Sequence, residues 1–342
     1  MSKIPEPETT IASLIDAVHE SRQDKPRPHL GASMLGHHCD RWLWLSFRWA
    51  VQEKFPGRVL RLFRRGQNEE AVIVSDLRAI GIDVQSTGDA QSRVDFGKHV
   101  SGSIDGIAAH SVPGAPKKPH ILEFKTHGDK SFKELIKAQS VKDANDQHWA
   151  QMQVYMMGKD IDRALYVAVN KNDDAIYTER VKLDKAEAQK LIERGHRIAM
   201  AERMPEPCAG ASPDWYLCKF CAAHTFCHSG EPTKHANCRT CAHVTPCEDS
   251  TFRCERWADT VPVYAQHDGC PSHALNPQLV PWDIDAERTT DWVACYIIDG
   301  KPVMNGEGHF HSSEIIANPS VCAIADDGMM LLREKFDAKV VG

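Results

Sequence analysis

The stretch His120-Ile-Leu-Glu-Phe-Lys-Thr126 decides how the rest of the chain is expected to fold. Side chains alternate along an extended strand, so Glu123 and Lys125 point to one face while their apolar neighbours point to the other. A second run, Ser101-Gly-Ser-Ile-Asp-Gly-Ile107, lies upstream, and a loop rich in Pro and Gly separates the two. We therefore expect a long-looped hairpin that brings Asp105 beside Glu123.

Two carboxylates and an ammonium at one point suit a hard divalent cation. Mg²⁺ takes oxygen ligands and usually binds only one or two carboxylates, which leaves positions for water and a phosphate oxygen. Such an ion polarises a phosphoryl group and acidifies a bound water, and the neighbouring Lys125 can position that water or neutralise developing charge. An ordinary surface hairpin with a Glu-Lys pair shows the same spacing, so other elements must decide between the two interpretations.

The order of these residues resembles a known family. Asp105 followed by Glu123-Phe-Lys125 resembles the D...E-x-K core of the PD-(D/E)XK nucleases, in particular the RecB-like branch that includes lambda exonuclease and the iron-sulfur nucleases of CRISPR adaptation. Upstream, Gly66 and Glu70 match the G-x-x-x-E element of a family helix. Glu69 is the rival for the helical carboxylate, and only the four-residue offset favours Glu70.

A fourth element lies downstream, where Gln151-Met-Gln-Val-Tyr155 matches the Q-x-x-x-Y element of the RecB branch. Gln151 and Tyr155 are four residues apart and share a helix face. A Gln amide can hydrogen-bond a phosphate or a metal-bound water, and a Tyr can add a hydroxyl or stack on a base. Core packing of Tyr155 and replacement of Gln151 by Gln153 stay open. The four elements occur in the family's order over about residues 31–228.

The resemblance implies an α/β restriction-endonuclease-like core, with a mixed central sheet flanked by helices, and hydrolysis of DNA with Mg²⁺ or Mn²⁺. The resemblance implies that Glu70, Asp105 and Glu123 bind the metal ion. It implies that Lys125 orients or activates the attacking water, and that Gln151 and Tyr155 help to bind the DNA. Stand-alone enzymes of this branch tend to be exonucleases in recombination or repair, and the cysteine-rich tail resembles phage and prophage proteins. We therefore expect an exonuclease, with a recombination or single-strand-binding protein as a partner. A structure- or modification-dependent endonuclease and a noncatalytic metal-thiolate DNA-binding or assembly protein are the alternatives.

The first cysteine group is Cys218-Lys-Phe-Cys221-Ala-Ala-His-Thr-Phe-Cys227. Cysteines three positions apart can bind one metal centre, and three thiolates require a fourth ligand. The resemblance implies that this ligand is Cys39, because the iron-sulfur nucleases carry one cysteine before the nuclease core and three after it, and these close a 4Fe-4S cluster. Zinc with His224 or His228 as the fourth ligand is the alternative.

The second cysteine group follows a linker and offers more ligands than one tetrahedral zinc ion can use. The preferred zinc ligands are Cys238, Cys241, Cys254 and Cys270. Cys247 and His273 are the alternative ligands. The segment is short and rich in thiols, so it is expected to be a zinc-ribbon-like appendage that folds around structural Zn²⁺. The isolated Cys208, Cys295 and Cys322 are interpreted as ordinary buried residues.

Composition limits the classes of protein to which the chain can belong. It has 342 residues, of which 42% are hydrophobic and 26% charged, as in globular proteins. The start has no apolar export segment and no apolar run reaches the roughly 18 residues of a membrane span, so we expect a cytoplasmic protein without membrane contact. Twelve cysteines in such a chain indicate metal ligation rather than disulfides.

The formal net charge of −6 means that any DNA-binding surface must be local. Two basic clusters flank the expected site: Arg58, Arg61, Arg64 and Arg65, and Lys125, Lys130, Lys133 and Lys137. Each is either a solvated face or a phosphate track.

The expected organisation has four parts: an N-terminal helix and linker (1–30), the nuclease domain closed by a cysteine cluster (31–230), the cysteine-rich zinc segment (231–280) and a small C-terminal region (281–342). Helices are expected over residues 4–21, 67–81, 131–138, 146–157, 183–203 and 331–337, and strands over 84–86, 91–96, 163–170 and 176–181, with a hairpin at 292–299 and 301–305. Residues 42–49 carry apolar side chains at helical spacing, and Gly158 is expected to end its helix.

Overall fold

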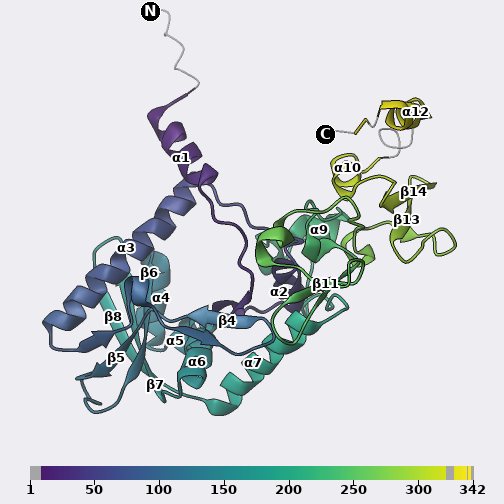
Figure 1. Cartoon of the computed structure of the whole chain (residues 1–342). Helices are drawn as coiled ribbons and strands as arrows, with labels where there is room; N and C mark the ends of the chain where they lie inside the picture. Colours follow the sequence, from purple (N-terminus) through teal and green to yellow (C-terminus); the bar gives the residue numbers. More distant parts are fainter. Residues whose placement is uncertain (1–8, 321–326, 337, 340–342) are drawn as a thin grey trace, which may run out of the picture.

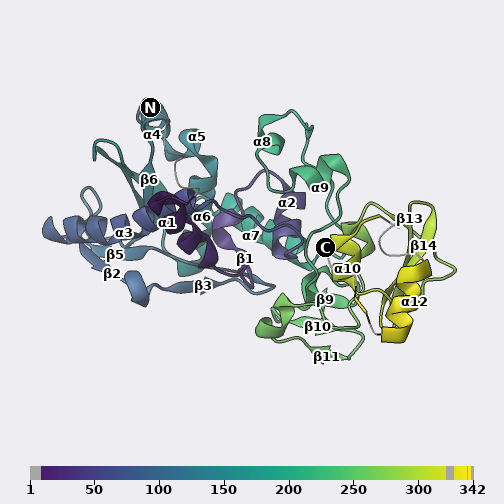
Figure 2. The same cartoon turned by 90° about the horizontal axis from the view of Figure 1, so that it is seen from above.

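The chain folds into a mixed α/β structure with a five-stranded sheet at one end and the C-terminal strands at the other (Figures 1 and 2). The structure is a computed structural model that describes residues 9–320, 327–336 and 338–339. No helix within these ranges has the length and apolar character needed to cross a bilayer.

The five-stranded sheet contains the predicted hairpin. From one edge to the other its strands are β2 (Asp83–Gln85), β5 (Gly106–His110), β6 (His120–His127), β7 (Arg163–Asn170) and β8 (Ile176–Lys182). Strands β5 and β6 pair antiparallel with Gly106 opposite Leu122, whereas β6 and β7 run parallel. The outer pairs are antiparallel, so the sheet is mixed.

Helices cover both faces of this sheet. The helices of the described residues are α1 (Ile11–Ser21), α2 (Asp40–Phe47), α3 (Gly57–Ala79), α4 (Asp129–Ala138), α5 (Val141–Ala144), α6 (Asp146–Lys159), α7 (Lys185–Met200), α8 (Tyr216–Lys219), α9 (His224–Ser229), α10 (Ser312–Ala317) and α12 (Asp327–Phe336). Leu122 and Phe124 of β6 share one hydrophobic cluster with Ile73 and Leu77 of α3. Side chains of α4, α6 and α7 build a larger cluster with the opposite side of the sheet. The strand therefore has the predicted alternation, with α3 on its apolar face.

A short second sheet divides the upstream run into two strands. Strand β4 (Val100–Ser103) lies between β1 (Leu30–Gly31) and β3 (Arg93–Asp95). The chain leaves this sheet after Ser103 and enters the main sheet at Gly106, so Asp105 lies at the break between them. Sequence alternation does not reveal such a change of sheet, because both halves are extended.

Helix α3 is longer than predicted. It begins at Gly57, ten residues before the expected start at Gln67, so Glu70 projects from the middle of the helix and not from its first turn. Arg and Leu between these positions are good helix formers, and Gly66 does not interrupt the helix. Helix α1 likewise begins at Ile11 with a Thr10 capping box, whereas the predicted start at Ile4 lies outside the described residues.

Gly158 does not end α6, contrary to the prediction. The helix continues to Lys159 and is capped by Asp160 in the left-handed conformation, with φ of 52°. The glycine instead allows a close approach to β3 and the residue after it, because a Cβ atom there would overlap Val94 and come within 2.7 Å of Phe96 Cζ.

The Gly158→Ala substitution is therefore expected to lower the free energy of unfolding. Overpacking costs about 1–3 kcal/mol, which exceeds the roughly 1 kcal/mol that alanine gains over glycine in a helix. Gly66→Ala is the matched control, because its nearest neighbour would be Thr126 Oγ1 at 3.4 Å. Urea unfolding should show a loss for the first variant and none for the second, and equal shifts would contradict the packing described.

The C-terminal part packs against the N-terminal part and also has a core of its own. Strands β9 (Val244–Pro246), β10 (Phe252–Cys254) and β11 (Asp259–Thr260) form one sheet, and Phe252 belongs to the same hydrophobic cluster as Phe47. Strands β12 (Asp283–Ile284), β13 (Val293–Ile298) and β14 (Lys301–Gly306) form another sheet with a separate cluster. The β13–β14 hairpin was predicted and has Ile298 opposite Lys301. The domain boundaries at 230 and 280 stay predictions.

Candidate active site

Asp105 is held against β6 by the backbone of that strand. Its Oδ2 accepts a hydrogen bond from the Phe124 amide at 2.9 Å. The side chain is largely buried, and burial raises its pKa, although Lys125 and this hydrogen bond act in the opposite direction. The break between the two sheets therefore presents a carboxylate directly beside the E-x-K strand.

Glu123 is the most deeply buried acid of the site, with 0% of the residue exposed. One carboxylate oxygen accepts a hydrogen bond from Lys125 Nζ, and the other accepts one from Gln151 Nε2 at 2.9 Å. Burial raises its pKa to about 8, and Asp105 and Glu70 add to the effect while Lys125 opposes it. The site thus holds several acids close enough for their charges to repel one another.

Glu70 reaches the same cluster from the middle of α3. Burial raises its pKa to about 7, Asp105 raises it further, and Lys125 lowers it. The charge of Glu70 also acts on Glu123 and on Lys125. The sequence left Glu69 and Glu70 as candidates for the helical carboxylate. Glu70 is the one whose charge interacts with the acids of the strand and the hairpin.

Lys125 is the cation of the cluster, and its side chain is 26% exposed. Burial lowers its pKa, but the charges of Glu123, Asp105 and Glu70 outweigh burial, so the net shift is upward. Lys125 therefore keeps its proton and balances part of the negative charge. No group of three or more His, Cys, Asp or Glu side chains in the described ranges is already arranged to hold a metal ion.

The two glutamines of α6 have different partners. Gln151 donates to Glu123, whereas Gln153 donates to the Lys182 carbonyl at 3.1 Å and accepts from the Asp184 amide at 2.7 Å. Gln151 is thus the glutamine of the acidic cluster, and Gln153 joins α6 to the start of α7.

Tyr155 packs inside the protein. Only 3% of it is exposed, and a Cβ atom at Gly102 would come within 2.6 Å of its hydroxyl oxygen. Burial raises the pKa of this phenol, and a hydrogen bond to Gln151 acts against that shift. Tyr155 therefore hydrogen-bonds to Gln151 inside the protein, and its buried ring is not accessible for a DNA base to stack on.

The sequence analysis did not identify His127 and His148, which lie near the acidic cluster. His127 Nε2 lies 2.8 Å and His148 Nδ1 lies 3.0 Å from the Tyr166 hydroxyl, and Tyr166 is opposite Glu123 in the parallel pairing. Burial, with the charge of Lys125, lowers the pKa of His148 to about 3, so it is neutral. Strand alternation from Lys125 to His127 was the signal that could have revealed the first of them.

The first basic cluster lines a hollow on α3. Arg58, Arg61, Leu62, Arg64, Arg65 and Asn68 form it. Arg61 is paired with Asp16 of α1, and Arg65 donates to the Lys171 carbonyl at 2.8 Å. The hollow precedes Glu70 on the same helix, and none of its arginines is among the charges that shift the pKa of Glu70.

The first cysteine group gathers around one cavity. Its lining includes Cys39, Cys218, Cys221 and Cys227, together with His224 and His228. Cys208 also lines this cavity and is hydrogen-bonded to Cys39, so its interpretation as an ordinary buried residue is wrong. The long loop after α7 brings Cys208 back to the group, and ligand spacing in the sequence cannot show this.

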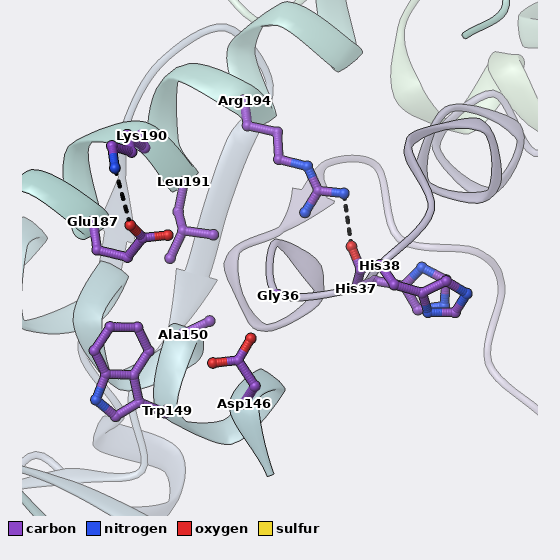
Figure 3. A pocket seen from close by; sticks show the side chains of 10 residues that line it. All are labelled: Gly36, His37, His38, Asp146, Trp149, Ala150, Glu187, Lys190, Leu191 and Arg194. Carbon is purple, nitrogen blue, oxygen red and sulfur yellow. Dashed lines mark hydrogen bonds and ion pairs between the residues drawn. The ribbon is translucent and has the colours of Figure 1, made fainter. Parts of the chain in front are cut away.

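A pocket beside α6 is lined by residues 36–38, which precede Cys39, and by Arg194, which holds this segment in place (Figure 3). Ala150 lines this pocket, whereas the next residue of the helix, Gln151, belongs to the acidic cluster. Arg194 of α7 donates to the Leu35 carbonyl at 2.5 Å and to the His37 carbonyl at 2.7 Å. Arg194 also pairs with Asp40, the first residue of α2. A single guanidinium thus holds the chain on both sides of Cys39.

The second cysteine group lines another cavity. Cys238, Cys241, Cys254 and Cys270 all contribute to its wall, as does His273. Cys247 is absent from the described lining. Cys295 is fully buried in β13 as predicted, and Cys322 lies outside the described residues.

Comparison with known proteins gives only distant likenesses. No protein-family model and no curated protein matches the chain. A solved structure titled as LHK-Exo in complex with dAMP has a TM-score of 0.38 at 15% identity, over 54% of this chain and 90% of that one. An alkaline exonuclease, LHK-Exo, from Laribacter hongkongensis has a TM-score of 0.34 at 16% identity, over 54% and 90%. A phage-related exonuclease from Haemophilus somnus has a TM-score of 0.27 at 17% identity, over 40% and 70%. The function is therefore argued from the site itself.

Proposed function

We propose that the protein is a Mg²⁺-dependent deoxyribonuclease of the PD-(D/E)XK type that hydrolyses phosphodiester bonds at DNA ends. The observation that carries the proposal is the convergence of Asp105, Glu123 and Lys125 in one largely buried cluster. A purely structural ion pair would need one acid for Lys125, whereas this cluster contains three: Glu70, Asp105 and Glu123. Burying several mutually repelling carboxylates costs free energy, and such costs are typical of functional sites.

The donor set fits a hard divalent cation. Glu70, Asp105 and Glu123 would hold Mg²⁺ or Mn²⁺, because carboxylate oxygens are the ligands these ions prefer. Burial raises the pKa of all three acids, and the charges of the neighbouring acids raise the pKa of Glu70 and of Glu123 further, so a bound cation would relieve that repulsion. When bound, the ion polarises the phosphoryl group and lowers the pKa of a coordinated water.

The other residues position the reaction. Hydrolysis forms a bond from water oxygen to phosphorus and breaks the bond to the leaving oxygen, which takes up a proton. Lys125 keeps its proton, so it would act by donating hydrogen bonds to the water or to a phosphate oxygen and by offsetting negative charge. Gln151 fixes one oxygen of Glu123, and Tyr155 supports Gln151.

DNA would approach along the basic side of α3. The arginine-lined hollow, which precedes Glu70 on this helix, would supply phosphate contacts that the net charge of −6 does not supply. Arg58 and Arg64 are exposed, although Arg64 Nη1 lies 3.4 Å from His19 Nε2, whereas Arg61 is already paired with Asp16.

The first cysteine group would carry a 4Fe-4S cluster. Cys39 precedes the core strands and the other three ligands follow them, so a cluster would clasp both ends of this part of the chain together. Support comes from the shared cavity and from the brace that Arg194 forms around Cys39. The role would be structural, since the cavity and the acidic cluster have no lining residue in common.

The test compares linear with covalently closed circular DNA in the presence of Mg²⁺. We expect the full-length protein to degrade linear DNA to nucleotides, to leave closed circles intact, and to stop on addition of excess EDTA. If the protein linearises closed circles, the proposed activity changes from that of an exonuclease to that of an endonuclease. DNA binding without cleavage of either substrate would overturn the enzymatic proposal in favour of a noncatalytic binding protein.

A further inference from the structure

Three separate chain segments bring four cysteines to one cavity in the C-terminal part. Cys238 and Cys241 flank a single turn of 3₁₀ helix, Cys254 ends β10, and Cys270 precedes a turn. The sheet fixes Cys254 opposite Val244, and an isolated bridge pairs Cys241 with Leu275. The backbone therefore brings all four cysteines to the wall of one cavity.

The rivals for these positions are otherwise engaged. His273 lines the cavity, but its Nδ1 lies 2.6 Å from Ser312 Oγ and its Nε2 lies 2.8 Å from the Asn237 carbonyl. Cys247 points to the Thr245 carbonyl, at 3.9 Å. Both therefore form their hydrogen bonds outside the group of four thiols. His243 also lines the cavity, and its buried Nε2 has no hydrogen-bond partner among the described residues, so the metal analysis must separate a site of four thiols from one that includes His243.

The residue that follows the first of these cysteines is a buried arginine. Arg239 is 1% exposed and donates to the Phe47 carbonyl at 2.9 Å, to the Pro28 carbonyl at 2.8 Å and to Gln266 Oε1 at 2.9 Å. All three acceptors are neutral oxygens, and the guanidinium also lies over aromatic rings, at 3.8 Å from that of Trp49, 4.3 Å from that of Phe252 and 5.2 Å from that of Phe47. The positive charge is thus removed from water with no carboxylate to balance it among these contacts.

A second guanidinium lies nearby. Arg48 is 3% exposed, and it donates to the carbonyls of Ala201 and Val244 at 3.2 and 3.4 Å. The charges of Arg48 and Arg239 act on each other. The carboxylate of Glu202 acts on Arg48 and offsets part of its charge, whereas no carboxylate is among the contacts of Arg239. A buried cation is costly unless an anionic centre lies close to it.

We propose that Cys238, Cys241, Cys254 and Cys270 bind one Zn²⁺ as thiolates, and that the buried Arg239, which follows Cys238 in the chain, offsets part of the charge of the resulting centre. One divalent ion with four thiolates carries a net charge of 2−. Binding displaces the four thiol protons to solvent. The thiols of the described residues are not yet at bonding geometry, so side-chain rotation must bring them together. The proposal does not depend on the nuclease activity.

Metal content of the full-length protein tests the ligand set. We expect Cys254→Ser to lose one equivalent of zinc relative to the wild type and Cys247→Ser to lose none. Zinc-edge absorption spectra of the unaltered protein should show sulfur ligands at about 2.3 Å for this ion, with no nitrogen shell. The spectrum decides the matter even if a variant fails to fold. Equal zinc in Cys254→Ser and wild type, or a nitrogen shell that persists in His224→Ala and His228→Ala variants, would overturn the four-thiolate site.

Charge balance is tested with two arginines that each adjoin a proposed ligand. Arg239 is buried beside Cys238, and Arg253 is exposed beside Cys254. Arg239→Met should weaken zinc retention against a competing chelator by about 10- to 100-fold, the range for groups that support metal ligands from outside. Arg253→Met should retain zinc like the wild type. Retention that is equal in the two variants would overturn the role of Arg239.

Discussion

DNA hydrolysis by the Lys125→Ala variant is expected to fall by about 10²–10³-fold, the usual effect of removing one group that stabilises transition-state charge. Lys125 is the cation hydrogen-bonded to Glu123, and its charge acts on Asp105 and Glu70 as well. Lys125 is the cation whose charge lowers the pKa of the Glu123 carboxyl group. The rate of acid-soluble nucleotide release from linear DNA with Mg²⁺ measures the loss.

Two further variants make this result specific. Asp105→Ala removes a proposed metal ligand and the acceptor of the Phe124 amide, so a comparable loss is expected. Lys182→Ala changes an exposed lysine at the end of β8 and should leave the rate unchanged. Thermal unfolding of each variant separates a lost function from a lost fold. Equal rates for the wild type and a folded Lys125→Ala variant would remove the basis of the proposed mechanism.

Iron is expected to disappear from the Cys227→Ser and Cys39→Ser variants, together with the brown colour expected for the anaerobically purified wild type. Each substitution removes one of the four proposed thiolate ligands, and such a cluster is held by cysteine thiolates. Iron and sulfide analysis and visible absorbance before and after reduction provide the measurement. Thermal stability should fall with the metal, because metal binding contributes directly to folding free energy.

Cys208 provides the matched control for this experiment. It lines the same cavity and contacts Cys39, yet it lies outside the C-x2-C-x5-C sequence. The Cys208→Ser variant is expected to keep its iron. Loss of iron from Cys208→Ser with retention in Cys39→Ser would exchange the two residues in the ligand set. A colourless wild type with stoichiometric zinc would replace the cluster by a zinc site.

Local patterns predicted the centre of the fold well. The alternation of His120–Thr126 gave its two faces, and the long-looped hairpin placed Asp105 beside Glu123. Strand β7 and the β13–β14 hairpin also lie where apolar and β-branched residues predicted them. These elements depend on neighbours within or next to the element, so the local sequence carries the information.

The features that were missed depend on distant contacts. Gly158 was interpreted as a helix end because glycine is common there, but its neighbours are Val94 and Phe96 on another element. Cys208 joins its group through a loop, and Tyr166 meets His148 across elements. No spacing rule along one chain segment predicts contacts that only the folded arrangement creates.

The hydrogen bonds of Arg239 have a consequence for the order in which the chain can fold. They reach back 192 positions to Phe47 and 211 positions to Pro28, and Thr233 reaches Ala50 across 183 positions. During synthesis the carbonyl groups of Pro28, Phe47 and Ala50 therefore lack these partners until residues 233–239 have emerged from the ribosome. Closing loops of that length slows folding, so nascent chains of this protein would be natural clients for chaperones.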